Sequence, residues 1–138
     1  MNASRTLIKV QVASAVYDYF AAGIFAFPIV AAWHLGGNIR FVHELLGSAG
    51  GFPEFEPFHL LFLNMFGGFT IMWSTLRIVW REKPLLGLCD GLLRYYFAFL
   101  MLTYVFYWET SAMLLVFVAS ELIWGTALIW LFLAQRKE

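Results

Sequence analysis

The chain has 138 residues, of which 62% are hydrophobic, 20% aromatic and only 13% charged, and its formal net charge is zero. This composition is more apolar than that of soluble domains and indicates a chain surrounded by lipid. The balanced charge, without a basic or acidic run, excludes the usual footprint of nucleic-acid binding, and the single Cys89 excludes an internal disulfide or a cysteine-based metal site.

Four stretches are long and apolar enough to cross a membrane. A membrane-spanning helix needs about 20 mostly apolar residues, because every backbone amide must be paired inside the segment. Residues 12–35, 58–80, 85–107 and 112–133 meet this requirement. The first is too long and too poorly ended for a cleaved signal peptide, which leaves a signal anchor as the lesser alternative. We predict an all-α fold, with residues 1–138 forming one transmembrane domain, a four-helix bundle of up-down-up-down topology.

The first span contains Pro28, which predicts a kink in its outer half. A long outer loop, residues 36–57, then joins the first two helices; residues 38–46 have apolar residues at helical spacing, and glycines between 47 and 51 break that pattern. The segment that follows alternates aromatic and acidic residues between two prolines, which is typical of an extended interfacial segment. A plain loop is the simpler interpretation. The alternative is an outer lid in which Glu54, Glu56 and His59 close a pocket.

The remaining connections, residues 81–84 and 109–111, are tight and predict that sequential helices are antiparallel neighbours. Basic residues indicate the orientation, because Lys and Arg resist translocation. They gather at one end of the predicted spans, at Arg5, Lys9, Arg77, Arg81, Lys83, Arg136 and Lys137. The other end has Arg40 among several glutamates. We therefore predict a multi-pass protein of the inner (plasma) membrane with cytoplasmic N- and C-termini.

Charged side chains inside the predicted spans are the strongest functional signal, since each costs roughly 2.5–3.5 kcal/mol at a helix centre unless it is paired or hydrated. They are Asp18, Arg77, Asp90, Arg94 and Glu121. In an antiparallel bundle these positions reach similar depths, and helical spacing places each on an inward stripe. We predict that Asp90 pairs with Arg94, and that Arg77 reaches Asp90 or Glu121. One carboxylate, Asp18 or Glu121, would then lack a basic partner and stay protonated.

These charges have two interpretations. A polar lock that aligns the helices needs only pairing. A ligand pocket also explains the unpaired acid and the two tryptophans, Trp73 and Trp124, that lie deeper than the interfacial aromatic belts. We predict that the ligand-binding residues are Asp18, Asn64, Trp73, Arg77, Asp90, Arg94, Tyr104, Glu121 and Trp124.

Two further patterns lie outside this set. Histidines and glutamates near the outer surface match no metal-ligand spacing, so we expect neither a metal nor another cofactor. Gly87 and Gly91 form a small-xxx-small pair, which predicts close contacts between helices or between subunits and leaves a homo-oligomer or a larger membrane complex open.

Three short motifs carry a resemblance to a known family: Phe66-Gly67-Gly68, Asp90 with Arg94, and the run from Glu121 to Gly125. Over its last three spans the chain resembles the small four-helix bacterial inner-membrane proteins called DoxX-like, and more distantly the EXPERA group of sterol isomerases and sigma-2-type receptors. The resemblance implies a compact bundle with a buried, acid-lined cavity for a quinone, a sterol or another apolar ligand.

The leading hypothesis is an accessory membrane protein that binds an apolar small molecule or lipid in an intramembrane polar pocket. The alternative is a membrane-embedded isomerase or cyclase, in which a protonated Glu121 or Asp18 donates a proton and aromatic rings stabilise the cation. The second alternative is a subunit of a proton-coupled transporter or of a larger membrane complex. The expected partners are the lipid bilayer and the apolar ligand, without nucleic acid.

Overall fold

The computed structural model describes residues 3–47 and 51–137, and every regular element within these ranges is helical. The elements in chain order are α1 (Ala3–Ala21), η1 (Gly23–Ala26), α2 (Pro28–His34), η2 (Leu35–Ile39), α3 (Arg40–Leu45), α4 (Pro57–Val79), α5 (Pro84–Tyr107) and α6 (Leu114–Gln135). The segment η1 is one turn of 3-10 helix, and η2 is a π-helical turn. The all-α prediction is confirmed.

Helices α4, α5 and α6 begin and end within two residues of the predicted spans. Pro57 and Pro84 lie in the first turns of α4 and α5, where the missing backbone N–H needs no partner. The turn before α5 is closed by the Lys83 N–H, which donates to the Trp80 carbonyl at 2.9 Å. These ends are local features, which explains why the sequence locates them.

The first predicted span is wrong in its bounds. Helix α1 begins at Ala3 and ends at Ala21, and Pro28 starts α2 instead of kinking a helix over residues 12–35. The break has a packing reason: η1 lies so close to α4 that a Cβ atom at Gly67 would come within 2.2 Å of the Ala26 nitrogen. Only glycine permits this backbone approach.

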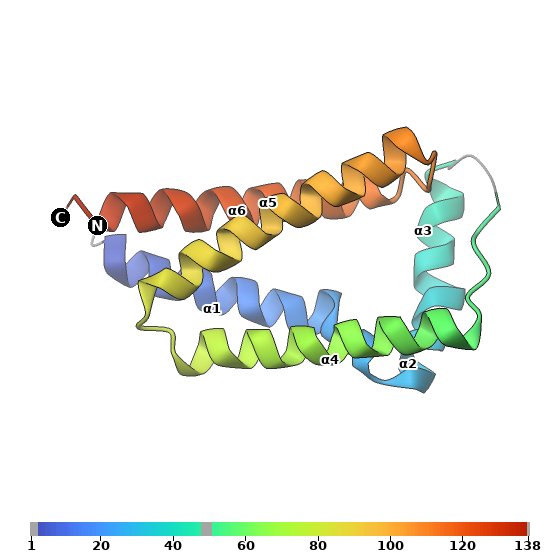
Figure 1. Cartoon of the computed structure of the whole chain (residues 1–138), viewed down its shortest axis with the longest axis horizontal. Helices are drawn as coiled ribbons and strands as arrows, with labels where there is room; N and C mark the ends of the chain where they lie inside the picture. The colour runs from blue at the N-terminus through green and yellow to red at the C-terminus, as the bar shows by residue number, and fades with distance from the viewer. Residues whose placement is uncertain (1–2, 48–50, 138) are drawn as a thin grey trace.

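The long helices lie lengthwise in two layers, α1 beside α4 and α5 beside α6, while α3 crosses one end of the molecule and both chain ends lie at the other (Figure 1). Helix α1 contacts both α4 and α6, so it joins the layers. Helices α5 and α6 are in extensive contact. Gly91 and Gly125 permit this contact, since a Cβ atom on either would be 3.1 Å from the carbonyl oxygen of the other.

The tight turn before Pro84 does not make α4 and α5 close neighbours. The two helices diverge from the turn, and along their lengths their backbones rarely come close (Figure 1). Side chains fill part of the space between them, among them the Phe66 and Phe97 rings, whose centroids are 6.3 Å apart. The expectation that short connections make sequential helices pack together therefore fails for this pair.

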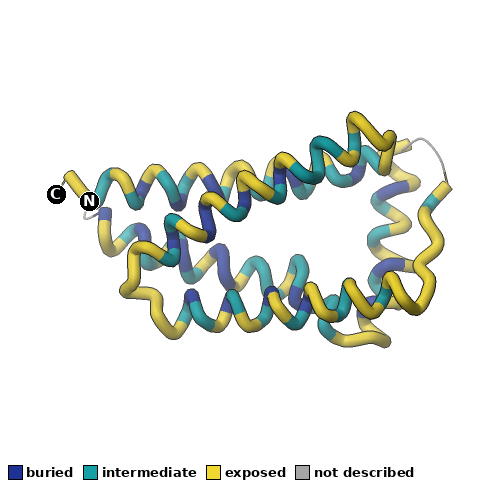
Figure 2. Tube along the Cα trace, viewed as in Figure 1, coloured by how far each residue is buried: buried dark blue, intermediate teal, exposed yellow. Residues whose placement is uncertain are grey.

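Charged side chains are buried inside the molecule, while many large apolar side chains are exposed. Arg77 is 0% exposed, whereas Phe69 on the same helix is 61% exposed and Ile123 is 68% exposed. Outward helix faces are exposed along most of their length (Figure 2). By length and composition, α5 and α6 are the two helices within residues 3–47 and 51–137 that are long and apolar enough to cross a membrane. An apolar exterior around a charged interior is typical of a chain solvated by lipid.

Candidate functional site

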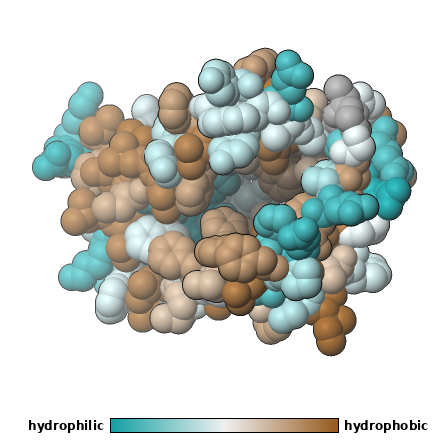
Figure 3. All heavy atoms as spheres, turned by 45° about the vertical axis from the view of Figure 1, so that its right-hand side comes forward, coloured by the Kyte–Doolittle hydropathy of each residue, from teal (hydrophilic) through white to brown (hydrophobic). Residues whose placement is uncertain are grey.

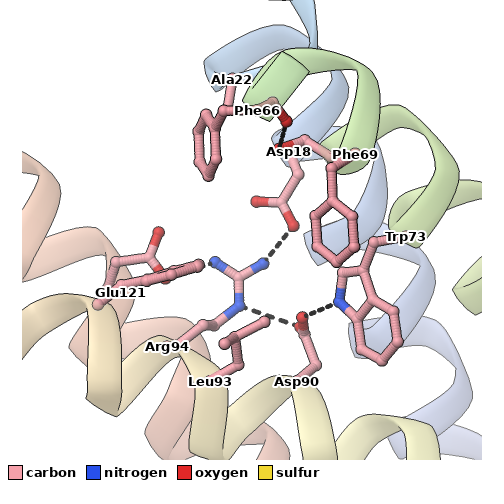
Figure 4. Close-up of a pocket in the computed structure, with 11 residues that line it drawn as sticks. Asp18, Ala22, Phe66, Phe69, Trp73, Asp90, Leu93, Arg94 and Glu121 are labelled. Atoms are coloured by element: carbon pink, nitrogen blue, oxygen red, sulfur yellow. Dashed lines mark hydrogen bonds and ion pairs between the residues drawn. The ribbon is translucent and has the colours of Figure 1, made fainter. Parts of the chain in front are cut away.

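Five charged side chains from four helices form one network of ion pairs. Figure 4 shows the part of the network around Arg94. Its Nη2 donates to Asp18 on α1 at 2.6 Å and its Nη1 donates to Glu121 on α6 at 3.1 Å. Its Nε donates to Asp90, one turn earlier on α5, at 3.0 Å. One guanidinium thus joins three carboxylates from α1, α5 and α6, and fixes the relative positions of these helices.

The second arginine, Arg77, enters the network from α4. Its guanidinium donates to the carboxylates of Asp18 and Asp90. It also donates to the hydroxyls of Ser14 and Ser74, both at 3.1 Å. All four acceptors lie on the inward stripes of their helices. Because Arg77 is fully buried, these bonds replace the water that its charge has lost.

The expectation that either Asp18 or Glu121 lacks a basic partner is wrong. Both carboxylates accept a hydrogen bond from Arg94, and Asp18 accepts a second from Arg77. Three acids share two arginines because each guanidinium bridges more than one carboxylate. The predicted Asp90–Arg94 pair and the reach of Arg77 to Asp90 are both present.

Trp73 is a further member of the network, with a neutral donor. Its indole Nε1 donates to Asp90 Oδ1 at 2.9 Å, while the arginines occupy Oδ2 of the same carboxylate (Figure 4). Asp90 therefore has both oxygens bonded. A partly buried indole N–H needs an acceptor, and Asp90 supplies it.

An apolar cavity of about 380 Å³ adjoins the network. Its lining on α5 consists of Phe97, Leu100, Met101 and Tyr104. Asp18 on α1 and Glu121 on α6 also line it. Arg94 and Trp73 are among the residues that line a smaller cavity of about 70 Å³. The two share lining residues and therefore adjoin. Figure 3 shows the molecule hollowed, with hydrophobic side chains beside the opening.

Asn64, Arg77 and Trp124, which were predicted to bind ligand, line neither cavity. The Asn64 Nδ2 donates to the Phe25 carbonyl at 2.6 Å, so this side chain ties η1 to α4. The Trp124 ring packs against Tyr17, with centroids 5.9 Å apart. Tyr104, by contrast, lines the larger cavity. Asn64 and Trp124 therefore contribute to the packing of the helices around the site.

The residues of the predicted lid also line neither cavity. Glu56 and His59 stand at the start of α4, where the Glu56 N–H donates to His59 Nδ1 at 3.3 Å. Glu54 lines a separate hollow beside Arg40. Their placement favours the plain-loop interpretation. Within residues 3–47 and 51–137, no group of three or more His, Cys, Asp or Glu side chains is arranged to hold a metal ion.

Sequence reasoning missed several apolar residues of the larger cavity, notably Phe66, Leu114 and Phe117. A signal for two of them was present, since Leu114, Phe117 and Glu121 follow the three- and four-residue spacing of one helix face. Phe66 gave no such signal. It lies at the cavity because α4 and α5 diverge, a feature that no local pattern reveals.

Known proteins add no further constraint on the site. No family model, no characterised protein and no solved structure matches the chain.

Proposed function

We propose that the chain is a multi-pass protein of the inner membrane, in which α1, α4, α5 and α6 form a four-helix, up-down-up-down transmembrane bundle. The charged interior and apolar exterior support this proposal, as do the length and composition of α5 and α6. Both chain ends lie at one end of the molecule (Figure 1). Lys and Arg gather at that end, which favours cytoplasmic termini.

We further propose that the bundle binds an apolar small molecule or lipid, as an accessory protein. The observation that carries this function is the apolar cavity of about 380 Å³ against the carboxylates of Asp18 and Glu121. This volume lies within the range of roughly 300–1,000 Å³ that is usual for small-molecule sites. Apolar walls with a few convergent polar groups are the usual composition of such sites.

The cavity separates this function from a purely structural polar lock. A lock explains the bonds of Arg77 and Arg94, but it does not require space beside them. The isomerase or cyclase remains the second candidate, because Trp124, one of the aromatic rings that could stabilise a cation, lies outside the cavity. No observation on the described residues favours the transporter.

The test is a substitution that fills the cavity and leaves the five charged residues of the network unchanged. Ala22 lines both cavities, so Ala22→Phe should occupy the space of the ligand. The matched control is Ala119→Phe on the exposed face of α6. Each protein is extracted in mild detergent, and the retained small molecules are identified by mass spectrometry while thermal stability is followed.

Wild type and Ala119→Phe should retain the same apolar molecule in near-stoichiometric amount, and Ala22→Phe should lose it without losing thermal stability. Two results would refute the proposal: a wild-type protein that retains no apolar molecule in any of several detergents, or an Ala22→Phe protein that retains as much as the control.

A further inference from the structure

The polar groups that face the larger cavity are few, and their hydrogen-bonding character can be read one by one. They belong to Tyr17, Asp18, Tyr104 and Glu121. The Tyr17 hydroxyl already donates to Ser120 Oγ at 3.0 Å. Tyr104 lies on α5 at the far end of the cavity, about 15 Å along the helix from Arg94. The polar end of the cavity therefore consists of the two carboxylates.

Neither arginine lines this cavity. Arg94 lines only the smaller cavity, and each of its three guanidinium nitrogens donates one N–H to a carboxylate. Arg77 lines neither cavity, because it is enclosed by Ser14, Ser74 and the aspartates. The positive charges thus hold the carboxylates in place without lining the apolar space themselves.

Each of the two carboxylates, in contrast, has one oxygen atom that accepts no bond from an arginine. The arginine bonds of Asp18 end on Oδ2, and that of Glu121 ends on Oε2. Asp18 Oδ1 and Glu121 Oε1 accept no hydrogen bond from residues 3–47 or 51–137, and neither atom is sealed within the protein. The polar end of the cavity thus presents hydrogen-bond acceptors without matching donors.

We propose that the cavity selects an apolar molecule whose polar head donates hydrogen bonds, a hydroxyl or an ammonium group, to Asp18 and Glu121. This inference rests on the proposed function and narrows its ligand class. A quinone or a ketone only accepts hydrogen bonds, so its oxygen would face carboxylate oxygens and find no donor there. A site built of acceptors rejects a ligand that cannot donate, because its own buried polar groups then stay unpaired.

The experiment compares ligands that differ only in the head. Purified wild-type protein in nanodiscs is titrated with a long-chain primary alcohol, with the methyl ether of the same chain and with the corresponding primary amine. The alcohol should bind about tenfold more tightly than the ether, the usual effect of one hydrogen bond to a charged group. An amine that binds more tightly than the alcohol identifies an ammonium head, and the reverse order identifies a hydroxyl head; either order supports donor selection.

Two failures are distinguishable. Equal affinities for the alcohol and the ether would overturn donor selection while leaving the binding function standing. Binding of none of the three compounds, together with no retained lipid in the wild type, would overturn the binding function itself.

A variant assigns the effect to a residue. Glu121→Gln keeps a carbonyl oxygen for Arg94 and places an N–H donor at the cavity, so the preference for alcohol over ether should fall several-fold. Glu82→Gln, in the exposed turn before α5, should leave the preference unchanged. An unchanged preference in Glu121→Gln would remove Glu121 from the site. The wild-type titration needs no variant, so it remains decisive if Glu121→Gln does not fold.

Discussion

Replacing Arg77 with methionine tests whether the buried network stabilises the fold. Methionine keeps a long side chain but removes the charge and every donor. Arg77 donates four hydrogen bonds, two to carboxylates and two to hydroxyls. In Arg77→Met the aspartates would share Arg94 alone. The Ser14 and Ser74 hydroxyls would lose the donor from Arg77, although Ser14 would keep its own bond to the Gln11 carbonyl.

The expected change in the free energy of unfolding lies between two bounds. Hydrogen bonds between membrane helices average about 0.6 kcal/mol each, so four of them set a lower bound of about 2 kcal/mol. Removing one partner of a buried ion pair costs about 3–5 kcal/mol, which sets the upper bound. Part of this loss of stability is offset, because the substitution also removes Arg77 Nε, a buried donor without a partner among the described residues. We therefore expect Arg77→Met to lower the free energy of unfolding by about 2–3 kcal/mol.

The assay is reversible unfolding in mixed micelles with increasing denaturing detergent. Arg81→Met is the matched control, because Arg81 lies exposed in the turn just beyond α4 and should change stability by less than about 0.5 kcal/mol. Adding Asp18→Asn to Arg77→Met should cost less than the sum of the single changes, since it removes one uncompensated charge. Equal stabilities of Arg77→Met and Arg81→Met would refute the claim that the network holds the helices together.

Two further predictions concern packing and topology. Gly67→Ala should destabilise the protein by about 1–3 kcal/mol, because the added Cβ meets the backbone of η1, whereas Gly68→Ala, with open space at the same position, should be neutral or slightly stabilising in the same unfolding assay. In a Cys89→Ser background, a membrane-impermeant maleimide should label Glu109→Cys in intact cells but Glu82→Cys only after lysis, and labelling of both positions in intact cells would contradict cytoplasmic termini.

The bounds of α4, α5 and α6 could be predicted closely because residues next to each helix end determine them. Each apolar run ends at a turn, and prolines stand at the start of α4 and α5. The bounds of the first helix could not be predicted in this way, because a hydropathy scale treats polar residues as exposed even where they are buried. The predicted span omitted residues 3–11 of α1, which contain several polar residues, although Gln11 among them is fully buried and donates to the Arg77 carbonyl on α4.

The same reasoning explains what was predictable at the site. Helical spacing placed Asp18, Arg77, Asp90, Arg94 and Glu121 on inward stripes, and a charge in an apolar chain has a strong energetic reason to find a partner. Which charges would share a partner was not predictable, because a simple count of acids and bases ignores bridging. Arg94 has donors in a fixed fork and can serve several carboxylates at once.

The cavity depends on distances between helices, and these are set by side chains that lie far apart in the sequence. Gly91 and Gly125 bring α5 close to α6, and Gly67 brings α4 close to η1, while no comparable small pair draws α4 against α5. The bulky rings of Phe66 and Phe97 meet there instead. Close packing on one side of α5 and bulk on the other open the apolar space beside the charges. The glycines of the sequence therefore determine which helices pack closely, and the lack of such a glycine contact between α4 and α5 determines where the apolar cavity lies.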